Sequence, residues 1–173
     1  FRFYDVRNAE AVSVAGQLSI RWAERAVNDY LNKILETDNE DYVLASDTDS
    51  LYVTMEKMVE KVGLTDTDKI IKFLDTVCDG KIQDVIDKCY GEMAEYVNAF
   101  QQKMVMKREV LADVGIWVAK KHYVLNVHNS EGVQYEEPKL KIMGIEAVKS
   151  STPEPCRNAL KKAFKIMMNG TED

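Results

Sequence analysis

The strongest structural signal in this chain of 173 residues is the stretch YVLASDTDSLYV, from Tyr42 to Val53. Two runs of apolar, β-branched and aromatic residues flank a polar centre, and this pattern predicts a β-hairpin. The centre places Asp47 and Asp49 on one tight corner. A turn needs only one such residue for its own backbone, and two adjacent like charges are unfavourable unless a cation or a proton offsets them. The corner is therefore a candidate divalent-metal site, with a solvated Asp-rich turn as the alternative.

The spacing of the two acids suits a hard cation such as Mg²⁺. Side chains at i and i+2 of a strand-turn-strand point to the same side, and Mg²⁺ prefers oxygen ligands while keeping waters and phosphates in its shell. Two carboxylates and a bound nucleotide would form a reasonable site. A calcium-binding loop is excluded, because Tyr52 stands where the sharp-turn glycine belongs and Met58 stands at the position of the closing Glu.

A second Asp-Thr-Asp, residues 66–68, has a different meaning because its flanks differ. It directly precedes a long run of apolar residues with helical period, from Ile70 to Val97. Acids at the start of a helix cap its N–H groups and complement its dipole. We therefore interpret this copy as a helix start. Gly80 is expected to kink that helix or to divide it.

The other elements predict an α+β protein. Helices are expected at 8–35, with Asn8 as N-cap, at 55–62, and at 154–168 after a capping segment at 150–153. Beyond residue 100 the period changes to that of strands, which are expected at 104–111, 115–119, 123–127, 133–135 and 139–142. Strands that follow strands imply an antiparallel sheet, and the long helices would pack on one of its faces.

Composition and charge set broad limits on function. Apolar residues make up 46% and charged residues 30%, as in ordinary soluble domains, and no apolar run approaches the length of a membrane span. The net charge of −6 argues against nucleic acid, but residues 101–150 carry 8 bases against 6 acids. A basic stretch in an acidic chain is compatible with contacts to a nucleic-acid backbone. The 3 scattered cysteines predict a reducing, cytoplasmic setting.

Three further groups of polar residues lie in the strand region. Lys107-Arg108-Glu109 places an acid within a basic segment, for which a cross-strand ion pair is the common explanation. Lys120-Lys121-His122-Tyr123 joins two cations to an aromatic hydroxyl at a strand junction, which suits phosphate contacts or, equally, a lysine-protected edge strand. Residues 139–151, KLKIMGIEAVKSS, alternate lysine with apolar residues and then break at Gly144, as at the exit from a domain.

In this order, the four motifs resemble the polymerase domain of family B DNA polymerases, in particular those of T-even-type bacteriophages. Asp47-Thr48-Asp49-Ser50 is similar to motif C of that family, and Lys120-Lys121-His122-Tyr123 is similar to its Lys-Lys-x-Tyr primer-contacting motif. Residues 139–153 resemble the segment that joins palm to thumb, and Phe1-Arg2-Phe3-Tyr4-Asp5 resembles the stretch after motif B. The similarity runs over essentially the full chain.

The resemblance implies a catalytic role for the acidic corner. Asp49 and Asp47 would be ligands of two catalytic Mg²⁺ ions, Thr48 would be a cofactor-binding residue between them, and Glu109 would be an accessory catalytic carboxylate. The implied reaction is two-metal transfer of a dNMP from a dNTP onto the 3′-hydroxyl of a primer on template DNA. Ala45-Ser46 departs from the usual Tyr-Gly before the acids and would alter the contact to the primer end.

The resemblance also implies DNA contacts in the strand region. Lys121 and Tyr123 would hold the primer strand, and Lys120, Lys141 and Lys149 are further DNA-binding candidates. Two positions in this region depart from the phage enzymes, which tend to have Asp where this chain has Lys107 and usually have Arg where it has His122.

The chain would then be part of a larger DNA-directed DNA polymerase. Residues 1–150 would be the C-terminal part of the palm domain, and residues 151–173 the start of the thumb. Motif A with its own Asp, the fingers and the exonuclease domain would lie in a missing N-terminal region, so the chain alone is expected to be inactive. We expect it in the cytoplasm, that of the host cell if it is phage-encoded, and away from membranes. A non-catalytic DNA-binding or assembly module that keeps the palm shape is the alternative, with another two-metal palm enzyme as a remote third.

Overall fold

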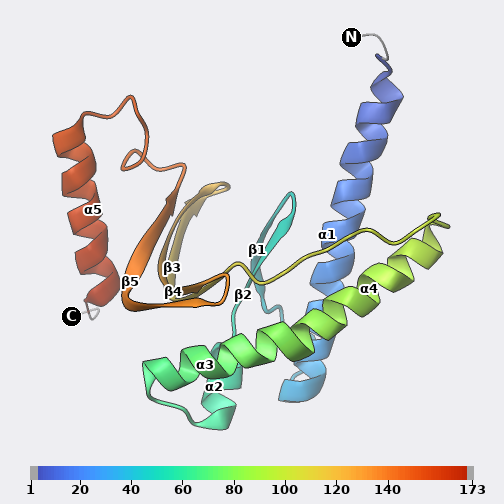
Figure 1. The fold of residues 1–173 in the computed structure, drawn as a ribbon, viewed down its shortest axis with the longest axis horizontal. Coiled ribbons are helices and arrows are strands. Elements are labelled where there is room, and N and C mark those ends of the chain that lie inside the picture. Colours follow the sequence, from blue (N-terminus) through green and yellow to red (C-terminus); the bar gives the residue numbers. More distant parts are fainter. Residues whose placement is uncertain (1–3, 171–173) are drawn as a thin grey trace. The chain divides into compact units, whose positions relative to one another are not determined.

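The structure, a computed structural model, describes residues 4–170 (Figure 1). Its contacts divide the chain into two units, Phe1–Arg108 and Glu109–Asp173. Both units combine helices with antiparallel strands, so the predicted α+β class is confirmed. The described strands form a two-stranded sheet in the first unit and a three-stranded sheet in the second, where the sequence had suggested one sheet.

The first unit is organised around α1 (Val6–Leu35). Its N-cap is Asp5, whose carboxylate accepts a hydrogen bond of 3.0 Å from the backbone N–H of Arg7. The prediction of Asn8 as the N-cap is therefore wrong, because a short acidic side chain three residues earlier already satisfies the exposed N–H groups. The helix ends at Leu35 as predicted, and Glu36 closes it in the left-handed conformation with φ of 59°.

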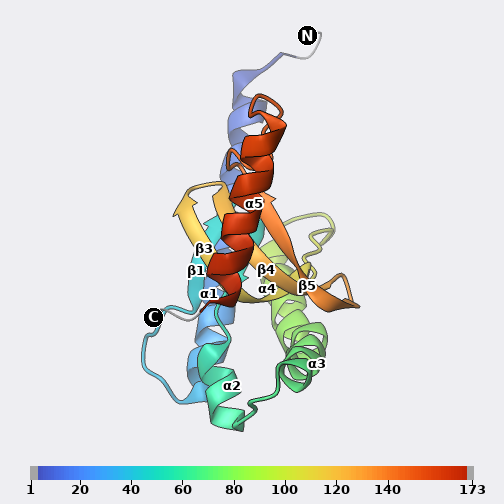
Figure 2. The ribbon, with the colours of Figure 1, turned by 90° about the vertical axis from the view of Figure 1, so that its left-hand side faces the viewer.

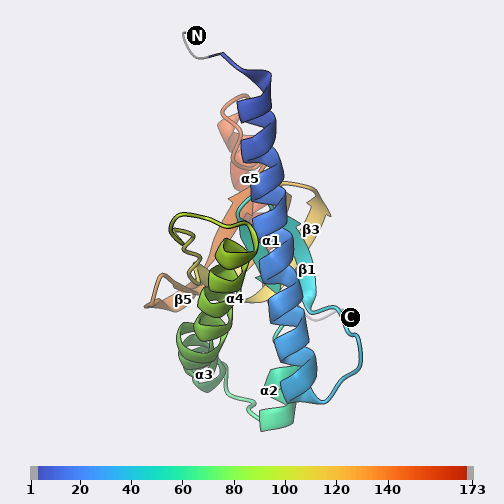
Figure 3. The same cartoon turned by 90° about the vertical axis from the view of Figure 1, so that its right-hand side faces the viewer.

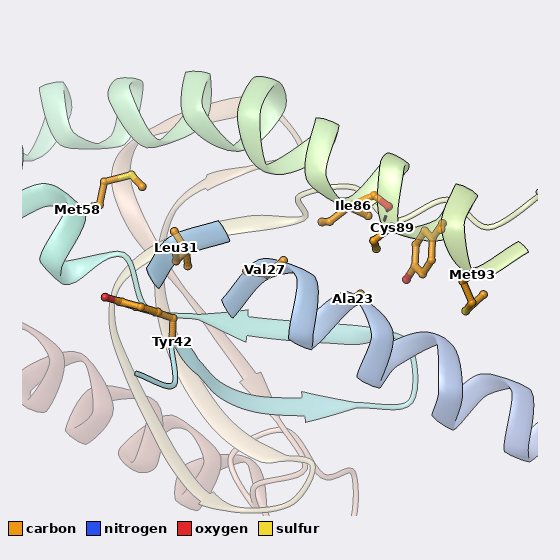
Figure 4. Close-up of a cluster of buried hydrophobic side chains, with 9 residues drawn as sticks. Ala23, Val27, Leu31, Tyr42, Met58, Ile86, Cys89 and Met93 are labelled. Atoms are coloured by element: carbon orange, nitrogen blue, oxygen red, sulfur yellow. Dashed lines mark hydrogen bonds between the residues drawn. The ribbon is translucent and has the colours of Figure 1, made fainter. Parts of the chain in front are cut away.

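The core of this unit lies between α1 and α4 (Gln83–Tyr96), which contact each other and cross obliquely (Figures 1 and 3). Ala23 is fully buried, and its small side chain lets the two helices approach. Tyr42 at the start of the hairpin and Met58 extend the same cluster (Figure 4). The other buried members are Val27, Leu31, Ile86, Cys89, Tyr90 and Met93. None of the helices in the described part of the chain combines the length and apolar character that a membrane crossing needs.

The helical region between the hairpin and α4 follows the sequence pattern closely. The short helix α2 (Glu56–Val62) ends at Gly63, which has φ of 71°. The N-cap of α3 (Thr67–Val77) is Asp66, whose carboxylate accepts a hydrogen bond of 2.9 Å from the N–H of Lys69, so the second Asp-Thr-Asp is confirmed as a helix start. A π-helical segment, η1 (Cys78–Ile82), joins α3 to α4 and contains Gly80, where a break was expected.

The predicted hairpin is confirmed as β1 (Val43–Asp47) and β2 (Ser50–Val53). Val43 pairs with Val53 and Ser46 pairs with Leu51, with an irregularity between Val43 and Ala45. Both strands contact α1, and Leu51 and Val53 pack against the helical core. The acidic corner is thus held by a hairpin that is fixed to the longest helix of the unit.

Among the described residues, the second unit is an antiparallel sheet in the order β3-β4-β5 with one helix (Figure 2). Its elements are β3 (Val110–Ala119), β4 (His122–Ser130), β5 (Val133–Met143) and α5 (Glu154–Asn169). Five short strands were predicted here, and three long ones form instead. The gaps between the predicted strands, at 112–114 and 136–138, contain exposed polar residues such as Asp113, and these positions lie within continuous strands. Residues 104–109, predicted as strand, have no regular structure.

The helix α5 packs on one face of this sheet. Leu160, Phe164 and Met168 of α5 join a cluster with Val124 of the central strand and Ile142 of β5. The helix begins at Glu154 as predicted, and its N-cap is Pro153 of the predicted capping segment, which supplies no side-chain hydrogen bond. The predicted domain boundary between residues 150 and 151 stays a prediction, and α5 belongs to the same unit as the sheet.

Candidate metal and nucleic-acid sites

The acidic corner is the tip of the β1–β2 hairpin. Asp47 is the last residue of β1 and pairs with Ser50, so Thr48 and Asp49 form the turn. The Asp47 carboxylate accepts hydrogen bonds from the Thr48 backbone N–H (2.9 Å) and from the Thr48 hydroxyl (3.2 Å). Asp47 is half-buried, whereas Thr48 and Asp49 are exposed. Thr48 therefore orients one carboxylate, and the other extends into solvent.

The chemistry of this corner fits Mg²⁺, but its donor set is incomplete. Carboxylate oxygens are the ligands that Mg²⁺ takes from proteins, usually one or two together with waters and phosphate oxygens. Within residues 4–170, no group of three or more His, Cys, Asp or Glu side chains lies close enough to hold a metal ion. Asp47 and Asp49 could therefore contribute to a magnesium site that other oxygen ligands complete.

The lysine motif forms the tight connection between β3 and β4. Ala119 pairs with His122, so Lys120 and Lys121 are the two turn residues, as the predicted strand junction requires. Both are exposed, and Lys121 adopts the left-handed conformation with φ of 63°. His122 contacts the Lys120 carbonyl through its ring Nδ1 at 2.9 Å. The turn therefore presents two ammonium groups on a fixed backbone.

Gly144, which follows β5, lies against this turn. A Cβ atom at Gly144 would stand 2.2 Å from the carbonyl oxygen of Lys121 and 3.0 Å from the ring of His122. Its φ of +69° is also one that side-chain-bearing residues rarely adopt. The break at Gly144 was visible in the sequence, but its contact with the lysine turn was missed, because only the strand register brings the two segments together.

Tyr123 is the first buried residue of β4 and pairs with Met143 and Trp117 on the flanking strands. Its ring centroid lies 6.4 Å from that of Trp117. The Trp117 ring in turn covers Gly115, where a Cβ atom would come within 2.6 Å of it. Trp117 is a supporting residue that the sequence analysis missed. The available signal was that Gly115 and Trp117, two residues apart, share one face of a strand next to the lysine motif.

Three other predicted site residues form ion pairs. Glu109, just before β3, forms an ion pair with Lys141 of β5, so the ion pair that the sequence left open is present, although Glu109 itself lies outside the strands. Lys149 donates a hydrogen bond of 2.6 Å to Glu146, and this contact holds the pKa of the Glu146 carboxyl below its usual range. Lys141 and Lys149 would therefore have to exchange a carboxylate for a phosphate in order to contact DNA.

The candidate residues fall into two groups by unit. Asp47, Thr48 and Asp49 belong to the first unit, and Glu109 and all the lysine and tyrosine candidates belong to the second. Residues 1–3 of the N-terminal motif lie outside the described residues, and Asp5 of that motif caps α1. The three cysteines are free thiols, and burial raises the pKa of Cys89 to about 11.

Comparison with known proteins identifies the family. A family model described as "Divergent Family B DNA polymerase" matches residues 34–173. The DNA-directed DNA polymerase of Escherichia phage RB69 is 44% identical over 99% of this chain, and that of Enterobacteria phage T4 is 40% identical over 99%. The chain spans about a fifth of the length of each relative, 20% in both cases. The chain belongs to the divergent family B DNA polymerases, which confirms the resemblance drawn from its motifs.

Proposed function

We propose that this chain forms part of the active site of a DNA-directed DNA polymerase that extends a primer on template DNA with dNTPs. The observation that carries the proposal is the acidic hairpin tip, Asp47-Thr48-Asp49, in a chain that is 44% and 40% identical to two proteins named as DNA-directed DNA polymerases. Within this proposal, residues 1–150 are palm and residues 151–173 begin the thumb. Such an enzyme would act in the cytoplasm of an infected cell.

The two aspartates have different parts in the proposed site. Asp49 is exposed at the turn and would supply the main carboxylate for two Mg²⁺ ions. Asp47 would be the second ligand, oriented by its hydrogen bonds from Thr48. Bound Mg²⁺ would supply charge stabilisation to the attacking and leaving oxygens of the nucleotidyl transfer. Glu109, with a side chain that is 61% exposed, would be an accessory carboxylate of the assembled site.

The lysine turn would hold the primer strand. Lys120 and Lys121 are exposed on a tight turn, and ammonium groups position phosphates without reading sequence. Tyr123 is fixed by its neighbour Trp117. A rigid support of this kind favours a positioning role, since a reacting end must be held to within a fraction of an ångström.

A non-catalytic DNA-binding module is the alternative, and the incomplete donor set of the hairpin tip is compatible with it. The two functions differ in whether the chain can support synthesis when the rest of a polymerase surrounds it. We expect the isolated chain to be inactive, because Asp47 and Asp49 need further metal ligands.

The test is a chimera in which this chain replaces the matched segment of the Escherichia phage RB69 polymerase. We expect the chimera to extend a labelled primer with Mg²⁺ and dNTPs, while the isolated chain does not. The change Lys121→Gln in the chimera should raise the KM for primer-template, with Lys72→Gln on α3 as the matched control. A folded chimera that binds primer-template but does not extend it would support the non-catalytic alternative instead.

A further inference from the structure

A pocket of about 350 Å³ lies between α5 and the sheet of the second unit. Its lining includes lysines 161, 162 and 165 of α5 and Lys139 of the edge strand β5, and we call it the lysine pocket. Pro138 and Leu140 supply its apolar part. None of the described residues that line it is acidic. The pocket therefore concentrates positive charge with no compensating carboxylate in its wall.

This charge cluster is unfavourable for the helix that carries it. Lys161 and Lys165 are four residues apart and Lys162 and Lys165 are three apart, so each pair shares one side of α5. Like charges at these spacings destabilise a helix by roughly 0.2–0.5 kcal/mol per pair. The helix dipole does not offset this cost, because the last turn of α5 has no basic residue. An anion in the pocket would remove the repulsion.

The two asparagines of the pocket do not compete with the lysines for an anion. The side-chain nitrogen of Asn126 donates to Asp113 (2.9 Å), and that of Asn169 donates to the carbonyl of Lys165 (2.8 Å). The Lys139 ammonium is engaged by the Tyr135 ring, whose centroid lies 3.9 Å away. The three α5 lysines, all exposed, are thus the groups available to an anion.

The lysine pocket and the proposed primer contact lie on opposite faces of the sheet. Asn126 pairs with Leu140, and these two share the face of Val124 that α5 covers. Tyr123 and Lys141 occupy alternate positions in the same strands, so their side chains point to the other face. A nucleic-acid strand bound by the lysines of α5 would therefore contact a different face of the sheet from one held at Tyr123.

We propose that the lysine pocket binds the phosphate groups of a single nucleic-acid strand that is separate from the primer terminus. Lysines bind phosphates as point charges, and the apolar residues Pro138 and Leu140 suit contact with sugar and base. The volume is that of a small-ligand pocket, which admits a flexible strand, whereas a rigid duplex would touch only its rim. The choice of nucleic acid over an acidic peptide rests on the proposed function.

The test measures binding of a fluorescent oligothymidylate to the 173-residue chain by anisotropy at several salt concentrations. The pocket variant carries Lys161→Gln, Lys162→Gln and Lys165→Gln. The control carries Lys69→Gln, Lys72→Gln and Lys81→Gln, three exposed lysines of the first unit, and has the same net charge. We expect the pocket variant to weaken binding and to reduce the slope of log K against log salt by about 2, since each lysine contributes about 0.7 on a single strand. The control should keep the slope of the unmodified chain.

Equal slopes for the pocket variant and the control would overturn the proposal. The proposal would also be overturned if polyglutamate or inorganic pyrophosphate, at equal concentration of anionic groups, displaced the oligothymidylate from the unmodified chain. The pocket would then bind any anion and would not distinguish a nucleic-acid strand. Failure here is separable from failure of the proposed function, which is measured as primer extension by the chimera. A chimera that extends primers together with equal slopes would disprove only the lysine pocket.

Discussion

Gly144 shows how one residue joins two segments that the proposed function uses together. The lysine turn and the chain after β5 meet where this glycine faces the carbonyl of Lys121. The sequence marks the position as a break, since glycine follows a run of alternating lysine and apolar residues. Which segment Gly144 packs against depends on the register of the three strands, and no local pattern specifies that register.

We therefore predict that Gly144→Ala is more damaging than an alanine at another glycine with positive φ. Gly132 provides the control, because its φ is +85° but nothing lies within 4 Å of an added Cβ. Gly132→Ala should lose only the conformational term, about 1–2 kcal/mol. Gly144→Ala should lose about 1–3 kcal/mol more in urea unfolding, since a backbone carbonyl must move to admit the methyl group. Equal losses for the two variants would mean that the close approach at Gly144 is not present in solution.

Among the elements, the two copies of Asp-Thr-Asp show what local context can decide. At 47–49 the tripeptide follows an apolar strand and turns a hairpin, and at 66–68 it precedes an amphipathic run and starts a helix. Both outcomes were predicted from the flanking residues alone. The lengths of the strands were not predicted correctly, because exposed polar residues inside a strand resemble the residues that end a strand. The sequence offered an ion pair for Glu109, but it did not identify the partner as Lys141, because the two residues are far apart in the sequence.

The cap of α3 gives a prediction at this scale. Asp66→Ala removes the acceptor for the N–H of Lys69 and should destabilise the chain by about 0.5–2 kcal/mol in urea unfolding. Asp66→Asn keeps an oxygen acceptor at the same place and should recover most of the loss. If Asp66→Asn were as destabilising as Asp66→Ala, charge rather than capping would explain the contribution of this residue.

At the scale of the whole molecule, the fold class and the family were accessible from the sequence, and the assembly of the site was not. The acidic tip lies in one unit, and the lysine turn with Tyr123 lies in the other. The motifs predicted that these groups act together, because their order along the chain matched that of a polymerase. No local pattern in the sequence specifies the geometry that would bring them together, and this chain spans 20% of the length of its relatives.

The most direct test of the metal-ligand assignment compares Asp49→Asn with Asp68→Asn in the RB69 chimera by single-turnover primer extension. Both changes remove the exposed last carboxylate of an Asp-Thr-Asp, so they alter net charge equally. We predict that Asp49→Asn slows extension by at least about a hundredfold, as expected when several kcal/mol of charge stabilisation is lost, while Asp68→Asn extends at the unmodified rate. Equal rates for the two variants would contradict the assignment of Asp49 as a metal ligand.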